Sequence, residues 1–160
     1  MIRKAERSDI PACVHVIRSA FQTVADEFGF TKENAPRFTA FAVTEERLIR
    51  QMEEEHRLMH LDEDDGVIRG YYSLLLMDGG ACELCNLSVL PACRHRGIGN
   101  SLLEHAKETA KRQDRAVMKL SIVEENARLR RWYENHGALH TGTEKFDFFP
   151  FACGFMTISL

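Results

Sequence analysis

A short run of glycines and basic residues, Arg94-His95-Arg96-Gly97-Ile98-Gly99, has the composition of a phosphate-binding loop. It follows an apolar segment that ends at Pro91, and it leads directly into a stretch with helical periodicity. Glycines let a ligand approach the backbone closely, and the first N–H groups of a helix are unpaired and lie at the positive end of its dipole. We therefore expect the peptide groups from residue 94 to Asn100 to bind a pyrophosphate, with Arg94 and Arg96 as added cationic donors.

Two other phosphate-binding motifs are excluded by the residues around this loop. The Gly-Lys-Ser/Thr sequence of a nucleotide P-loop is absent. A dinucleotide fingerprint requires a third glycine three residues after Gly99, where this chain has Leu102. The shorter Gly-x-Gly pattern remains, and by itself it is a weak signal, because strand-to-helix turns often contain glycine.

The loop resembles the acetyl-CoA signature of the GNAT N-acetyltransferase superfamily, Arg/Gln-x-x-Gly-x-Gly/Ala, at the same kind of strand-to-helix junction. Arg94, Gly97 and Gly99 match its fixed positions, and the preceding Leu87-Ser88-Val89-Leu90-Pro91 is also similar to that family. The family resemblance implies a pyrophosphate of coenzyme A as the ligand of the loop.

A second segment is similar to another motif of the same family, Asn…Leu-Tyr-Glu-x-x-Gly-Phe. It begins at Asn126, passes Leu129 and continues through Trp132-Tyr133-Glu134-Asn135-His136-Gly137-Ala138. Trp132 stands where an aliphatic residue is usual, and Ala138 stands where phenylalanine is common. Two separated motifs in the right order are far more specific than either alone, and the detailed resemblance covers about residues 81–139.

The resemblance implies an enzyme that forms a ternary complex of acetyl-CoA and an amine and transfers the acetyl group directly. An acyl-CoA-binding sensor or interaction module without turnover is the alternative from another class. A cysteine-dependent acyl carrier using Cys85 or Cys153 is a third hypothesis, which predicts ping-pong kinetics and sensitivity to thiol alkylation.

Glu83 is the expected general base. An alkyl amine with a pKa near ~10 is mostly protonated at neutral pH and must lose a proton before it attacks. A carboxylate on an interior strand is costly to bury, and Glu83 occupies the position where several family members carry their base. Roughly 20 Å of extended strand from Glu83 to Val89 would accommodate a pantetheine arm. An outward-facing or salt-bridged Glu83 is the alternative.

The remaining roles come from the resemblance. Backbone groups near Leu87 and Val89 are expected to bind the pantetheine amides, and a strand N–H is expected to polarise the acetyl carbonyl. Tyr133 is the expected acid that protonates the departing thiolate, although its helical spacing alone would predict a core aromatic. Asn126 is expected both to cap its helix and to bond the cofactor. No histidine is expected to be catalytic.

The hydrophobic pattern predicts the elements that hold these residues. A first helix is expected to start where Ser8-Asp9, with a capping side chain, precedes Ile10-Pro11, and to run to about residue 26. A second helix is expected over 44–55, strands over 57–61, 67–77 and 81–90, a helix from 98, a strand over 116–123 and a shorter helix around 129–136. The segments 139–149 and 152–160 are expected to form a closing hairpin. This order predicts an α/β fold with a mixed, mostly antiparallel central sheet, flanked by helices on both faces, in a single domain over residues 1–160.

The acceptor is expected to lie between the segment at 28–43 and the last hairpin at 145–155, as the family resemblance implies. Both segments are rich in phenylalanine, and Phe28, Phe30 and Phe148 are the predicted substrate contacts. This composition favours a partly apolar acceptor, or else a homodimer contact through the same surface. The acceptor could be a small amine, an amino acid, an antibiotic or a protein amine.

Composition excludes several other classes. With 21 Lys and Arg against 24 Asp and Glu, the chain has a net charge of −3 and no basic field that would recruit nucleic acid or an anionic membrane. No signal peptide or run of about 20 apolar residues is present, so a cytoplasmic location is expected. The five cysteines are expected to be reduced thiols, and no metal site is expected, because Cys82-x-x-Cys85 lies in a strand-like run and has no second pair with zinc-like spacing.

Overall fold

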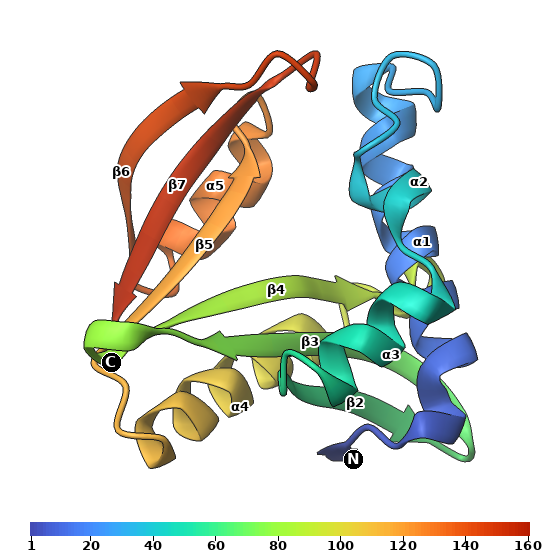
Figure 1. The fold of residues 1–160 in the computed structure, drawn as a ribbon, viewed down its shortest axis with the longest axis vertical. Helices are drawn as coiled ribbons and strands as arrows, with labels where there is room; N and C mark the ends of the chain where they lie inside the picture. Colours follow the sequence, from blue (N-terminus) through green and yellow to red (C-terminus); the bar gives the residue numbers. More distant parts are fainter.

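One seven-stranded sheet, in the order β1-β2-β3-β4-β5-β7-β6, forms the centre of the computed structural model, which describes residues 1–160 (Figure 1). The strands are β1 (Ile2–Lys4), β2 (Leu58–Asp64), β3 (Val67–Leu76), β4 (Ala81–Val89), β5 (Val117–Val123), β6 (Ala138–Lys145) and β7 (Ala152–Ser159). All neighbouring pairs are antiparallel except β4 and β5, which are parallel. The predicted mixed, mostly antiparallel sheet is confirmed.

Five helices cover the sheet on both faces, as expected. They are α1 (Ile10–Phe28), α2 (Thr39–Ala42), α3 (Glu45–Glu53), α4 (Ile98–Arg112) and α5 (Ala127–Glu134). On one face α1 and α3 bury Ile17 and Leu48 against Met59 and Leu61 of β2. On the opposite face α4 and α5 share a core that is centred on Leu102 and on the strand side chains between them. The alternation of strand side chains between the two faces therefore produces two separate apolar layers.

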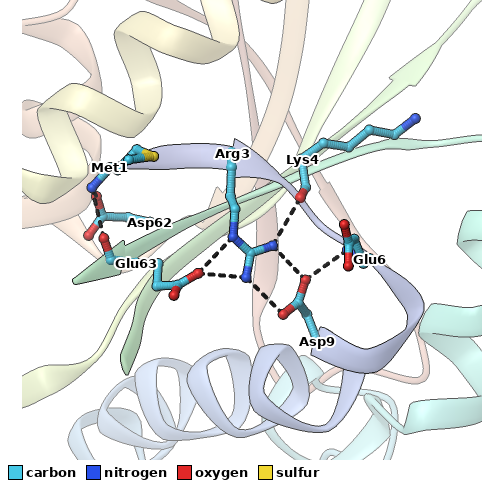
Figure 2. Close-up of polar contacts among 7 residues, drawn as sticks. All are labelled: Met1, Arg3, Lys4, Glu6, Asp9, Asp62 and Glu63. Carbon is cyan, nitrogen blue, oxygen red and sulfur yellow. Dashed lines mark hydrogen bonds and ion pairs between the residues drawn. The ribbon is translucent and has the colours of Figure 1, made fainter. Parts of the chain in front are cut away.

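The N-terminal strand β1 was not predicted, because three residues are too few to show the alternation that marks a strand. It pairs antiparallel with β2, and polar contacts hold it there (Figure 2). The Arg3 guanidinium donates to Asp9 at 2.7 Å and 3.0 Å and to Glu63 at 2.7 Å. Asp62 is buried and forms ion pairs with the Met1 amine at 3.3 Å and with Arg69 at 2.7 Å.

The start of the first helix also differs in detail from the prediction. The helix α1 begins at Ile10, directly after Ser8-Asp9 as predicted, but a 3-10 turn over Arg7–Asp9 precedes it and its first turn holds no acidic residue. The Asp9 carboxylate accepts the Glu6 N–H at 2.8 Å as well as the Arg3 contacts, and it makes no capping bond to the first turn of α1. The Arg3 hydrogen bond holds the pKa of Asp9 below its usual value.

The feature that shapes the site is the separation of β4 from β5. They pair only where Ala81–Glu83 faces Val117–Lys119, and then diverge, while β5 continues along β7 (Figure 1). A bulge in β4 accounts for the divergence: Tyr72 on β3 lies opposite two residues of β4, Asn86 and Leu87, and Asn86 has a left-handed φ of 54°. A bulge bends its strand and increases its twist. The edge of β4 that faces β5 is thus without a strand partner beyond Glu83.

None of the helices combines the length and the apolarity that a bilayer-crossing helix needs.

Candidate active site

An open cavity of about 190 Å³ lies where β4 and β5 separate. That is many times the roughly 10–15 Å³ that admits one water molecule, so the cavity has room for a ligand. Its near walls are Leu84, Asn86 and Leu87 of β4, Leu120–Val123 of β5, and Asn126, Leu129 and Tyr133 at α5. Its far wall consists of Phe21, Val24, Phe38, Thr39, Phe149, Phe151 and Cys153.

The loop between β4 and α4 presents a row of unpaired peptide donors. The six consecutive N–H groups from His95 to Asn100 have no hydrogen-bond acceptor within the chain, and the next one, Ser101, bonds the Gly97 carbonyl at 3.0 Å. His95 and Gly97 have left-handed φ values of 63° and 80°, which turn the chain sharply before α4 begins at Ile98. Free amides at the positive end of a helix are a common binding site for phosphate groups.

The two arginines of the loop have different surroundings. Arg94 donates from Nη1 to the Thr23 hydroxyl and from Nη2 to the Ala20 carbonyl, both at 3.1 Å, and its burial lowers its pKa. Arg94 therefore ties the loop to α1, a contact that the sequence did not predict. Arg96 and His95 are exposed, and their side chains have no hydrogen-bond partner in the chain. Arg96 is the loop cation whose donors are all free for a phosphate.

His136, which sequence reasoning set aside, connects α5 to the first turn of α4. One ring nitrogen lies 2.7 Å from the Trp132 carbonyl oxygen and the other lies 2.7 Å from Asn100 Oδ1. The Trp132 ring is 4.4 Å from the His136 ring and also borders Gly99, where an added Cβ would lie 3.6 Å from the indole. These contacts fix the start of α4 beside the loop, and no sequence signal distinguished His136 from the other histidines.

Tyr133 lies on the cavity wall with 6% of its surface exposed. Its hydroxyl makes no hydrogen bond within the chain, and burial raises its pKa well above the usual value. The phenol is therefore protonated at neutral pH and is free to donate its hydrogen to a ligand.

Asn126 caps α5 as expected, since its Oδ1 accepts the Leu129 N–H at 3.2 Å. Asn126 also lines the cavity. The same side chain can thus cap the helix through its oxygen and still offer its amide N–H groups to a ligand.

Glu83 is half-buried at the point where β4 and β5 separate, which we call the vertex. It is the last residue of β4 that pairs with β5, and it lies opposite Lys119. It forms no ion pair and its carboxylate has no hydrogen-bond partner, so the salt-bridged alternative has no partner to support it. Glu83 does not line the cavity, whereas its neighbour Leu84 does. A water molecule would be needed to relay a proton from the cavity to this carboxylate.

The cysteines of β4 and β7 are poor nucleophiles in these surroundings. Cys82 is fully buried and Cys85 lies on the opposite face of β4. Burial raises the pKa of Cys82 to about 11 and that of Cys85 to about 12, and it also raises the pKa of Cys153 on the cavity wall. Protonated thiols do not support the acyl-carrier hypothesis. No group of three or more His, Cys, Asp or Glu side chains is arranged to hold a metal ion.

The phenylalanines lie differently from the prediction. Phe28, Phe30 and Phe148 do not line the cavity. Phe30 is buried behind the wall, Phe28 stacks on Phe30 at 6.0 Å, and Phe148 is 41% exposed, with the Arg37 guanidinium 4.3 Å from its ring centre. The four that do line the cavity are Phe21, Phe38, Phe149 and Phe151. The phenylalanine-rich composition of segments 28–43 and 145–155 did not indicate which rings line the cavity.

A comparison with protein families gives a match over residues 20–138, to the family described as the acetyltransferase (GNAT) family. The matched range contains β4, the loop with free amides, β5 and α5.

Individual relatives are consistent with that match. An uncharacterised N-acetyltransferase of Lactobacillus delbrueckii subsp. lactis is 24% identical over 147 residues, covering 85% of this chain and 82% of the relative. The PaiA N-acetyltransferase of Thermoplasma acidophilum, solved with coenzyme A, has a TM-score of 0.82 at 18% identity and covers 100% of this chain and 98% of its own. An acetyltransferase of Salmonella typhimurium, solved with its cofactor acetyl-CoA, has a TM-score of 0.73 at 22% identity, with coverage of 100% and 93%. The last two comparisons establish a shared fold.

Proposed function

The chain belongs to the acetyltransferase (GNAT) family, and we propose that its residues 1–160 act as one domain that transfers the acetyl group of acetyl-CoA directly to an amine. The observation that supports this most is the row of six unpaired amides from His95 to Asn100, at the start of α4. A chain with no anionic ligand would leave these donors to water. In the proposal they bind the pyrophosphate of coenzyme A, assisted by the free guanidinium of Arg96.

The unpaired edge of β4 is proposed to bind the pantetheine arm. Between Glu83 and the end of β4, peptide groups that face β5 have no strand partner. Such an edge binds extended amide-containing chains through main-chain hydrogen bonds, as an added strand would. Leu87, on the cavity wall, and Val89, at the end of β4, supply these peptide groups.

Acetyl-CoA supplies the activated acetyl thioester, and residues of this chain accept and donate the protons of the reaction. Glu83, through a water molecule, accepts a proton from the acceptor ammonium group, so that the nitrogen carries a free electron pair. The nitrogen then forms a bond to the acetyl carbon and releases its second proton to water, while the carbon–sulfur bond breaks. Tyr133 donates its phenolic hydrogen to the departing sulfur and regains a proton from solvent. The products are the N-acetyl amine and coenzyme A.

Calorimetry with coenzyme A and a thiol-release assay over an amine panel test the proposal. Wild-type protein is expected to bind coenzyme A and to release thiol only with an acceptor. Glu83→Gln is expected to bind coenzyme A normally and to lose about 10²-fold in kcat, a typical effect of removing a general base. Glu54→Gln, at the exposed C-terminal end of α3 and outside the cavity lining, is the matched control and is expected to keep full activity.

The outcomes separate the hypotheses. Folded protein that takes up no coenzyme A would overturn the proposed function. Coenzyme A binding without turnover on any amine would favour the acyl-CoA sensor. Full activity in Glu83→Gln would remove Glu83 from the mechanism while leaving the activity intact.

A further inference from the structure

The far wall of the cavity carries no charged side chain and is apolar except at Thr39, and we infer that the acceptor is a primary amine on a single uncharged aromatic body, an arylalkylamine. This inference rests on the proposed acetyl transfer and names the acceptor class of that same site. The near walls, β4, β5 and Tyr133, are assigned above to the acyl donor. The space left for the acceptor is the end bounded by α1, α2 and the β6–β7 connection.

The charge pattern of the cavity excludes most amine classes. None of its 17 lining residues is an acid, a lysine, an arginine or a histidine. A carboxylate on the acceptor, as in an amino acid, would be buried here without a cation. A second ammonium group, as in a polyamine or an aminoglycoside, would be buried without an anion. Burying an unpaired charge is strongly unfavourable, so both classes are disfavoured relative to a monoamine with a neutral body.

The aromatic rings of the wall suit a flat apolar body. Phe149 and Phe151 stack with centroids 4.6 Å apart at an interplanar angle of 21°, and Phe21 meets Phe38 edge-to-face at 5.8 Å. The wall therefore offers both ring faces and ring edges. An aromatic acceptor can pack on either in the offset or edge-to-face geometry that aromatic pairs prefer.

The two phenylalanine-rich segments meet, which disfavours a protein acceptor. Phe151, in the β6–β7 connection, lies 4.8 Å from Phe30 and 5.7 Å from Phe38, and all three rings are buried. The two segments thus contact each other at the aromatic end of the cavity. A polypeptide acceptor needs a trough along which its following residues can leave the site, and this contact leaves no such trough between the rings of the two segments.

The apolar wall also assists the proposed chemistry. A low-polarity environment disfavours the ammonium form of a bound amine and lowers its pKa. The acceptor therefore loses its proton more readily in the cavity than in water. As a result, the difference in proton affinity between the bound amine and the Glu83 carboxylate is smaller than it would be in water, which makes the proton transfer to Glu83 easier.

A panel of acceptors that differ in charge and in chain length tests the inference in the thiol-release assay with this protein. The panel contains 2-phenylethylamine, phenylalanine, spermidine and a short peptide with a free N-terminal alanine. We expect kcat/KM for 2-phenylethylamine to exceed that of each other acceptor by at least about 100-fold, because each of the others adds a charge or a chain that the cavity cannot accommodate.

A pair of neighbouring phenylalanines supplies a matched control. Phe149→Ala removes a lining ring, and Phe148→Ala removes an exposed ring that does not line the cavity. Phe149→Ala is expected to raise KM for 2-phenylethylamine about 10-fold or more, while Phe148→Ala stays within about twofold. Both variants are expected to melt as cooperatively as wild type and to bind coenzyme A with unchanged affinity.

The experiment separates failure of this inference from failure of the proposed function. Coenzyme A binding together with turnover of phenylalanine, spermidine or the peptide at least equal to that of 2-phenylethylamine would overturn the arylalkylamine assignment alone. So would equal effects of the two phenylalanine substitutions, or no turnover of any panel member. Absence of coenzyme A binding would overturn the proposed function and this acceptor class with it.

Discussion

At the scale of single residues, burial decides which ionisable groups of this protein can take part in chemistry. The Tyr133 phenol and the Cys153 thiol, both on the cavity wall, are held in their protonated forms because their anions would lose water without gaining a partner. Protonated groups can donate hydrogen but cannot attack. Among the ionisable groups at the cavity, Tyr133 therefore suits an acid role, and the thiols suit neither an acyl-carrier nor a metal-binding role.

Replacement of Tyr133 by phenylalanine tests the acid role. We expect kcat to fall about 10²-fold with little change in coenzyme A affinity, because only the phenolic hydrogen is removed from an otherwise preserved ring. Tyr71→Phe, at a fully buried tyrosine outside the cavity, is the control and is expected to keep wild-type turnover. Steady-state kinetics and calorimetry measure the two effects. A Tyr133→Phe enzyme with wild-type kcat would mean that solvent, and not Tyr133, protonates the departing thiolate.

His60 predicts how stability depends on pH. Its ring stacks on Tyr72 at 5.2 Å and meets His105 at 4.9 Å, and its Nδ1 is buried without a partner. Burial, followed by the charges of His105, Lys4 and Arg112, lowers the pKa of His60 to about 4. The unfolded chain, with an ordinary histidine pKa near ~6.5, therefore binds more protons between these values. The free energy of unfolding is expected to fall as pH drops from about 6.5 toward 4.

Urea unfolding at several pH values, on wild type and His60→Phe, measures this effect. The variant keeps an aromatic ring on Tyr72 but cannot bind a proton, so its stability is expected to vary less over that range. Some dependence should remain, because burial also lowers the pKa of His105. His15→Gln, on an exposed part of α1, should behave as wild type. Identical pH slopes in wild type and His60→Phe would contradict the role of His60.

At the scale of elements, the site is produced by two local departures from regular structure. The bulge at Asn86 directs β4 away from β5, and the turn at His95 and Gly97 lies in a loop whose six consecutive amides from His95 to Asn100 are unpaired. Both leave backbone groups unpaired, and unpaired groups are the binding surface of the proposed cofactor.

Gly97→Ala tests the turn. Gly97 has a φ of 80°, where a side chain costs roughly 1–2 kcal/mol although nothing lies within 4 Å of the added Cβ. The free energy of unfolding is expected to fall by about 1 kcal/mol. Coenzyme A affinity is also expected to fall, because the strained backbone would displace the N–H groups proposed to bind the pyrophosphate. Gly142→Ala, where φ is not left-handed and space is also free, is the control and should change neither. Urea unfolding measures the stability and calorimetry measures the affinity. Unchanged coenzyme A affinity in Gly97→Ala would argue against pyrophosphate binding by the six amides of the loop.

Most elements were predictable because their signals are local. Turns at Asp65-Gly66 and Asp78-Gly79-Gly80 separate the strands of the meander, and the periodic apolar residues from Ile98 define α4. The strand β1 was missed because its pairing with β2 is set by contacts more than 50 residues away. The bulge at Asn86, the Arg94 contact to α1 and the inward-facing phenylalanines likewise depend on partners distant in sequence. The motifs indicated candidate site residues such as Arg94 and Asn126, but they did not indicate which side chains and backbone groups surround them.

At the scale of the whole molecule, the chain consists of two arms that meet at the vertex. The arm of β1–β4 and the arm of β5–β7 share the short β4–β5 pairing (Figure 1). Phe30 and Phe38 on the first side also contact Phe151 in the β6–β7 connection. An exposed ion pair at 3.0 Å between Glu27 of α1 and Arg128 of α5 adds a further link between them. The proposed ligand lies between these contacts and touches both arms.

A ligand that touches both arms is expected to stabilise them together. At a free concentration of 100 times its Kd, coenzyme A should add about 2.7 kcal/mol to the free energy of unfolding, since it binds only the folded chain. For a chain of this length that corresponds to a rise in Tm of about 5–10 °C. Calorimetric scans should show one transition that moves as a unit. Gly97→Ala at the same coenzyme A concentration should shift less, because its affinity is lower. Two transitions, of which coenzyme A moves only one, would mean that the ligand contacts a single arm, and the pantetheine would then not lie between β4 and β5.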